Sequence, residues 1–129
     1  MAGNPGEGRE ANTGSRRPGH FQRAQGQWGP APAGVALFHG DAQRADFLAG
    51  CDSLVNLLPL TDQTRGVLNA GLFAQLPRSA HLVNVGRGEH LVEADLLAAL
   101  ASGQLGAATL DTFAQEPLPP DSPLWDEPN

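Results

Sequence analysis

Short apolar runs alternate with helical patterns along the chain from Gly34 onward. The apolar runs predict buried strands within 35–40, 53–59, 80–85 and 106–111. Between them, apolar residues recur at helical spacing within 41–50, 69–77 and 93–103. Such strands, alternating with helices, are typical of a parallel sheet with helices on both faces and right-handed crossovers. We therefore predict an α/β fold with a parallel sheet and flanking helices.

The ends of the predicted helices carry residues that start and stop helices. Asp41 is expected as the N-cap of the first helix, and Gly50 as its C-terminal stop. In the last helix, Leu96, Leu97 and Leu100 are expected to share one buried face.

The chain divides into two unlike parts. Residues 1–33 are rich in glycine and proline, and their only large apolar residues are Met1, Phe21 and Trp28. Such a segment cannot bury enough apolar surface to offset the entropy lost on ordering, so we predict that it is disordered or irregular. Residues 34–129 are expected to form an α/β unit that ends in a proline-rich tail.

Composition excludes several kinds of function. The net charge is -6 and no basic cluster occurs, which argues against nucleic acid as a partner. All eight basic residues are arginines, so neither a Schiff-base lysine nor a P-loop lysine is present. Cys51 is the only cysteine and is expected to be a small buried apolar residue. No apolar run is long enough to span a membrane and no secretory signal occurs, so we expect a cytoplasmic protein.

Candidate binding residues follow the predicted strands, where ligands bind in sheets of this kind. These positions hold Leu58-Pro59, Gly86-Arg87-Gly88 and Asp111, with Glu116 five residues further on. An arginine presents a planar set of donors that matches a carboxylate, and flanking glycines let a ligand approach the backbone. The alternatives are a surface arginine in a tight turn, an aspartate that caps a turn and a solvated loop glutamate.

Histidines and glycine motifs add little to the site. His81 is expected in the core or at a strand edge, whereas His90, which follows the Arg87 loop, either faces the site or lies on the surface. No two histidines have the spacing of metal ligands, so we predict no metal. The sequence also lacks a Gly-x-Gly-x-x-Gly loop after a strand and a Gly-x-Ser-x-Gly nucleophile turn.

Several motifs in order carry a family resemblance from about Gly34 to the end. The segments "SLVNLLPLTDQTRGVLN" and "LVNVGRGEHLVEADLLAALASGQLGAATLDTFAQEPLPPDSPLW" resemble the D-isomer-specific 2-hydroxyacid dehydrogenases. The motifs "NLLP", "RGEHLVEADLLAAL" and "EPLPPDSPLW" are most similar to those of the glyoxylate/hydroxypyruvate reductases of the A type. The resemblance implies that residues 34–129 form a partial NAD(P)-binding domain, with a partial Rossmann-like parallel sheet that is the second half of a dinucleotide-binding domain. It also implies NAD or NADP as cofactor, a small 2-oxo or 2-hydroxy acid as substrate, and pairing into a homodimer.

The resemblance also implies roles for individual residues. Arg87 matches the arginine that holds the substrate, and Glu116 matches the glutamate that pairs with the family's catalytic histidine. Asp111 matches an aspartate that contacts the nicotinamide amide. The cofactor-binding positions implied in this way are Leu58, Pro59, Thr64, Val85, Gly86, Arg87 and Asp111. The family often has alanine at the position of Gly86.

Other parts of the family pattern find no match. The family histidine stands in a Pro-His motif just after the position of Asn129, and none of His20, His39, His81 and His90 matches it. The glycine-rich loop belongs before Gly34, where no match occurs. We therefore expect a fragment of a reductase with negligible activity alone. The alternatives are a non-catalytic half-domain that binds a partner or itself, and a largely unfolded remnant without function.

Overall fold

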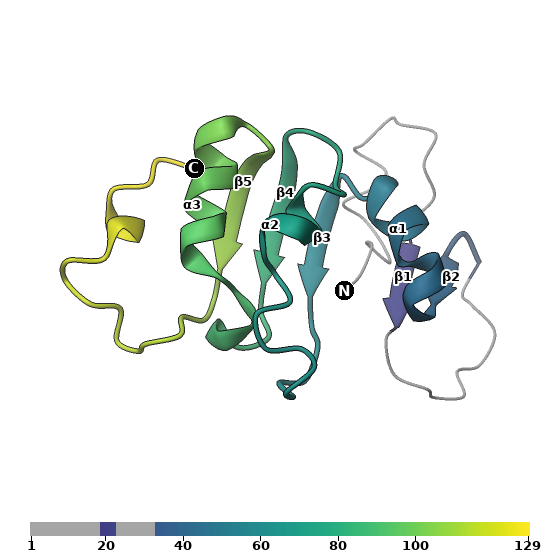
Figure 1. Ribbon diagram of the computed structural model, residues 1–129, viewed down its shortest axis with the longest axis horizontal. Helices are drawn as coiled ribbons and strands as arrows, with labels where there is room; N and C mark the ends of the chain where they lie inside the picture. Colours follow the sequence, from purple (N-terminus) through teal and green to yellow (C-terminus); the bar gives the residue numbers. More distant parts are fainter. Residues whose placement is uncertain (1–18, 23–32) are drawn as a thin grey trace.

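The computed structural model describes residues 19–22 and 33–129 (Figure 1). The helices and strands, in chain order, are β1 (Gly19–Gln22), β2 (Ala36–His39), α1 (Gly40–Ala49), β3 (Ser53–Asn56), α2 (Ala70–Phe73), β4 (Ala80–Asn84), α3 (Glu93–Ser102) and β5 (Leu105–Leu110). Two short 3-10 turns are η2 (Gly88–His90) and η3 (Pro123–Trp125). Each predicted strand and helix from residue 34 onward is present, so the α/β prediction is confirmed.

The central sheet has three parallel strands in the order β3-β4-β5. In its register Leu54 lies beside Leu82, and Leu82 lies beside Ala108. β1 and β2 form a separate parallel pair, which lies with α1 beside the three-stranded sheet (Figure 1). All three strands of the central sheet therefore end at the same edge.

The prediction that residues 1–33 are irregular is wrong for Gly19–Gln22, which form β1. Parallel pairing with β2 provides backbone hydrogen bonds, and these do not require apolar side chains. The rest of the predicted irregular segment, apart from Ala33, lies outside the described residues.

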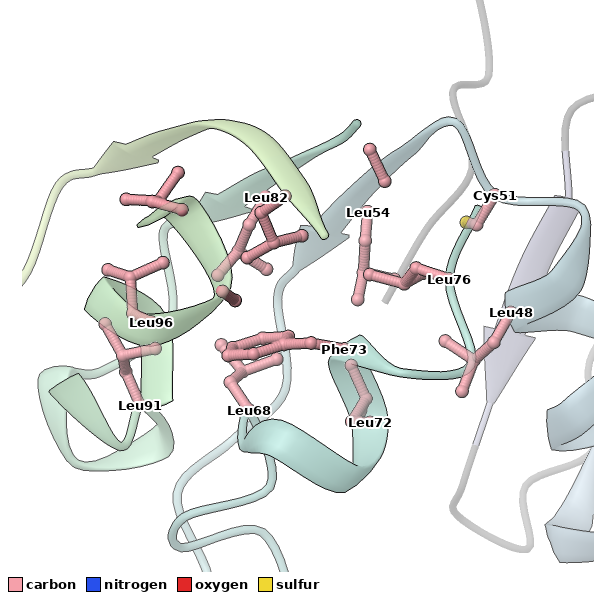
Figure 2. Close-up of a cluster of buried hydrophobic side chains, with 14 of the residues drawn as sticks. Leu48, Cys51, Leu54, Leu68, Leu72, Phe73, Leu76, Leu82, Leu91 and Leu96 are labelled. Atoms are coloured by element: carbon pink, nitrogen blue, oxygen red, sulfur yellow. The ribbon is translucent and has the colours of Figure 1, made fainter. Parts of the chain in front are cut away.

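Among the described residues, helices cover one face of the central sheet. Figures 1 and 2 show α2 and α3 on the same side, with the core side chains between them and the strands. On the other face Val55 and Val83 remain half-buried. The prediction of helices on both faces is therefore wrong for this part of the chain. The chain crosses the sheet in one direction, β3 to β4 to β5, and crossovers of one hand then place both helices on one side.

The core lies between the sheet and the two helices (Figure 2). Leu54 and Leu82 reach down from the strands, Phe73 and Leu96 come from the helices, and all four are at most 1% exposed. Burying a side chain of this size contributes about 1.5–3 kcal/mol, so this layer holds the sheet in place. Cys51 is buried in the same cluster, as predicted.

Two details of the helices differ from expectation. The N-cap of α1 is His39, whose backbone N–H donates to Gln43 Oε1 at 2.7 Å, and Asp41 lies in the first turn. In α3, Leu97 is only half-buried, and Ala99 joins Leu96 and Leu100 on the buried face. The prediction considered only the large apolar side chains of the helix. A small residue such as Ala99 is also buried where the helix lies close to the sheet.

Within residues 19–22 and 33–129, none of the helices has the length and apolar character that crossing a membrane requires.

Candidate functional site

Three loops meet where the central strands end. In Figure 1 the arrowheads of β3, β4 and β5 point to this edge. The N–H of Val85 donates to Asn56 O at 3.2 Å, and the N–H of Asp111 donates to Asn84 O at 3.0 Å. We call the loops 57–59, 85–88 and 111–116 the carboxyl edge. The predicted neighbourhood of Leu58-Pro59, Arg87 and Asp111 therefore follows from the strand register.

Two buried asparagines lie directly beneath the carboxyl edge. Asn56 and Asn84 are fully buried, and Asn56 Nδ2 donates to Asn84 Oδ1 at 2.9 Å. Asn56 Oδ1 accepts from Leu58 N at 3.2 Å, and Asn84 Oδ1 accepts from Gly86 N at 3.2 Å. Asn84 Nδ2 donates to Arg87 O at 3.1 Å. The two asparagines therefore hold loop 57–59 and loop 85–88 together.

Sequence reasoning missed both asparagines, although the chain carries a signal for them. Leu-Val-Asn occurs twice, at 54–56 and 82–84, at the end of two predicted neighbouring strands. In parallel register the two amides must face each other, and a buried amide requires a hydrogen-bond partner.

Arg87 projects from the middle loop and is exposed. Its Nη1 donates to the backbone oxygen of the preceding residue, Gly86, at 3.0 Å. Among the described residues, Arg87 forms no ion pair with a carboxylate. Its backbone is held from below by Asn84, so the side chain starts from a fixed point while its remaining donors stay open to a ligand.

The glycine after Arg87 brings the third loop close. A Cβ on Gly88 would lie 1.8 Å from the carbonyl carbon of Phe113, so only glycine permits this approach. The N–H of Phe113 in turn donates to Glu116 Oε1 at 2.9 Å. The carboxylate of Glu116 is thereby tied to the loop that touches Gly88. Both Glu116 and Asp111 are exposed.

The predicted cofactor-lining positions differ in how far they are exposed. Val85 is 39% exposed and Pro59 is exposed, and Leu58 is half-buried. Thr64 is buried, and its hydroxyl donates to Pro59 O at 2.8 Å, so it stabilises the Pro59 loop from inside. Sequence reasoning missed Leu57, which is 58% exposed beside the buried Asn56. The alternation of side chains along β3 already indicates that Leu57 faces away from the core.

His90 does not lie where either alternative placed it, whereas His81 lies within a strand, as expected. His90 is fully buried, so it neither faces a ligand at the carboxyl edge nor lies on the surface. His81 is half-buried in β4, and its Nε2 lies 2.9 Å from Thr109 Oγ1. Throughout 19–22 and 33–129, no three His, Cys, Asp or Glu side chains are grouped as metal ligands.

The surface also has hollows away from Arg87 and Asp111. One, of about 350 Å³, is lined by residues of α1, α2 and the segment between β3 and α2, including Arg44 and Arg65. Another, of about 310 Å³, lies between α3, β5 and the tail and includes Leu110 and Trp125. Neither of these two includes Arg87, Asp111 or Glu116, whereas a further hollow of about 350 Å³ includes Ala114 and Gln115 of the 111–116 loop.

The chain is similar to a defined family. The family described as "D-isomer specific 2-hydroxyacid dehydrogenase, NAD binding domain" matches residues 35–129. Glyoxylate/hydroxypyruvate reductase A from Serratia proteamaculans is 54% identical over 104 residues, which are 78% of this chain and 33% of that protein. The reductase of the same name from Yersinia enterocolitica is 52% identical over 74% of this chain and 30% of its own length. The chain thus spans about a third of the curated relatives it matches.

Solved structures agree in fold. A D-isomer specific 2-hydroxyacid dehydrogenase family protein from Klebsiella pneumoniae is 53% identical with a TM-score of 0.78, covering 85% of this chain and 34% of that one. An NADPH-dependent glyoxylate/hydroxypyruvate reductase from Sinorhizobium meliloti, in complex with NADP and sulfate, is 44% identical with a TM-score of 0.75. That match covers 84% of this chain and 35% of the other.

Proposed function

Because this chain belongs to the D-isomer specific 2-hydroxyacid dehydrogenase family, in its NAD-binding domain, we propose that its carboxyl edge holds the nicotinamide end of NAD or NADP and a small 2-oxo acid of the glyoxylate or hydroxypyruvate type. The observation that carries the proposal is Arg87, exposed and without a carboxylate partner among the described residues, on a loop fixed by Asn84. Its open donors match the carboxylate and carbonyl oxygens of such an acid.

Arg87 has two tasks in this proposal. It pairs with the substrate carboxylate, which orients the carbonyl carbon, and it places positive charge where negative charge develops on the carbonyl oxygen. Glu116 lies on the loop that touches Gly88 and is positioned to pair with a protonated group brought to the edge. The backbone contact between these loops keeps the arginine and the glutamate at a fixed separation.

The residues at the carboxyl edge fit a nicotinamide ring. Leu57 and Val85 provide exposed apolar surface, and Asp111 provides an exposed carboxylate that accepts hydrogen bonds from an amide. When bound, the dinucleotide supplies the hydride. Solved relatives that hold NADPH or NADP make the phosphorylated form the first to test, with NADH as the alternative.

We further propose that this chain alone has negligible reductase activity. His90 is buried and His81 is bound to Thr109, so neither provides an acid or base at the carboxyl edge. General acid–base catalysis contributes roughly 10²–10⁴-fold. The oxidation of NADPH by glyoxylate or hydroxypyruvate is therefore expected to stay at background, and turnover at the rate of the full-length relatives would contradict this.

Binding provides the direct test of the function. Oxalate, an unreactive dicarboxylate, is titrated into the ¹⁵N-labelled chain with and without NADPH, and the amides of residues 86–88 are followed by NMR. We expect saturable shifts at these amides. Arg87→Gln should weaken oxalate binding about tenfold or more, because a hydrogen bond to a charged group contributes about 1.5–3 kcal/mol.

Arg78→Gln is the matched control, since it removes the same charge from an exposed arginine just before β4, at the opposite end of that strand. An equal loss in both variants would indicate general attraction of anions and would refute a site at Arg87.

A further inference from the structure

We propose that His90 is a positioning residue that locks the backbone of Arg87 to the Pro59 loop through its imidazole ring. The inference builds on the proposed function, because it concerns how the substrate arginine is held. It assigns a role to a histidine that the proposed function leaves unused.

The ring of His90 bridges the two loops at close range. Its Nδ1 accepts from Arg87 N at 3.0 Å, and its Nε2 lies 3.3 Å from Pro59 O. The side chain is fully buried. A side chain so enclosed, with both ring nitrogens engaged by backbone, cannot exchange a proton with a ligand at the carboxyl edge, so its part is to position Arg87.

The surrounding hydrogen bonds define one tautomer. Arg87 O already accepts from Asn84 Nδ2 and from the backbone N–H of His90, which occupies both of its lone pairs. Although Nδ1 also lies 3.1 Å from Arg87 O, it is therefore the acceptor for the Arg87 N–H. The proton then resides on Nε2, which donates to Pro59 O. A neutral ring with this tautomer satisfies every group around it.

Two further features keep the ring in place. The backbone of His90 is held by the segment between β3 and α2, because Leu68 N donates to His90 O at 2.8 Å. Gly86 leaves the ring its space, since a Cβ there would lie 2.8 Å from His90 Nδ1 and 2.9 Å from Asn56 Nδ2. Glycine at position 86 therefore leaves space for the imidazole of His90.

Three variants separate the two ends of the bridge. His90→Asn keeps an acceptor near the position of Nδ1, His90→Gln keeps a donor near the position of Nε2, and His90→Leu removes both while filling most of the space. We expect hydrogen exchange of the Arg87 amide to rise about tenfold in His90→Leu and His90→Gln, and to stay near the wild-type rate in His90→Asn. Oxalate affinity should follow the same order.

The tautomer gives a readout that needs no variant. In ¹⁵N spectra of the wild-type side chain, Nδ1 should appear as the unprotonated, acceptor-type nitrogen and Nε2 as the protonated one. A proton on Nδ1 would overturn the proposal even if every variant failed to fold.

The remaining outcomes are equally distinct. If His90→Leu keeps both the protection of the Arg87 amide and the affinity for oxalate, His90 has no positioning role. If His90→Asn loses as much as His90→Leu, the effect is general packing and the inference fails. If the wild type ignores oxalate while amide protection still follows the acceptor at position 90, the proposed function fails but the link between His90 and Arg87 stands.

Discussion

At the scale of single residues, Gly88 shows how closely the loops of the carboxyl edge approach each other. A Cβ at this position would meet three backbone atoms of Phe113 and Ala114, at 1.8, 2.1 and 2.2 Å. Backbone atoms cannot move aside as the tip of a side chain can, so any side chain here must displace the loop that carries Glu116.

Gly88→Ala should therefore destabilise the protein and separate Glu116 from the Arg87 loop. We expect the free energy of unfolding, measured with urea, to fall by about 1–3 kcal/mol, as for other overpacked sites. Gly50→Ala is the control, because a Cβ there would meet only ordinary contacts at 3.7 and 3.8 Å, and its effect should stay within about 0.5 kcal/mol. Equal stability of both variants would show that the loops separate easily.

The positions of Arg87 and Asp111 at the carboxyl edge could be predicted from the sequence, but the groups that hold the Arg87 loop could not. Arg87 was predicted from its place after a strand and between glycines, and Asp111 from its place after the next strand. His90 was not assigned, because a local pattern gives no measure of burial. Its burial results from contacts with Pro59, 31 residues earlier in the chain. The fold alone brings that partner to the ring.

At the scale of elements, α2 is so short that its ends decide its stability. It spans Ala70–Phe73, and its N-cap is Asn69. Asn69 Oδ1 accepts from Leu72 N at 3.1 Å, and Asn69 Nδ2 donates to Gly66 O at 2.8 Å. One side chain thus starts the helix and fixes the loop before it, and Phe73 is then directed into the core.

Asn69→Ala should lower the free energy of unfolding by about 1 kcal/mol, since an N-cap acceptor is lost. Asn69→Asp retains the acceptor and should be less destabilised, even though it cannot donate to Gly66 O. Urea unfolding of the three proteins would measure the difference. If the alanine and aspartate variants unfold alike, the cap is not what stabilises this turn.

Strand and helix order was the most predictable level of the structure, and strand length the least. The apolar run 53–59 predicted one strand, but β3 ends at Asn56. Leu58 N donates to the side chain of Asn56 instead of to a neighbouring strand, and this turns the backbone away. Apolar composition does not distinguish a buried strand from the apolar edge that follows it. β1 was missed because Gly19–Gln22 lacks an apolar run, whereas its parallel pairing with β2 uses backbone groups.

At the scale of the whole molecule, the central sheet is unequally covered within the described part of the chain. Helices α2 and α3 lie on one face (Figure 2). Val55 and Val83, which alternate with the buried leucines along β3 and β4, are half-buried on the other. Apolar side chains on such a face favour association, which supports self-association of this domain as a second candidate function.

Val83→Lys tests that second candidate at the centre of the sheet. If copies pair through this face, the wild type should show a molecular mass that rises with concentration in analytical ultracentrifugation, and the lysine variant should remain monomeric. Gln75→Lys places the same charge at an exposed position of the segment after α2 and should leave association unchanged. A wild type that stays monomeric across the concentration range would exclude self-association through this face.

The asparagine pair beneath the carboxyl edge has a consequence for assembly as well as for binding. Because side chains alternate along a strand, sliding β3 by one residue against β4 would turn Leu54 and Asn56 to the other face of the sheet and leave the buried amide of Asn84 without its partner. Only one alignment lets Asn56 and Asn84 meet. The bond that supports Arg87 therefore also selects the strand alignment, so a misaligned sheet would lack both a well-packed interior and a fixed Arg87 loop.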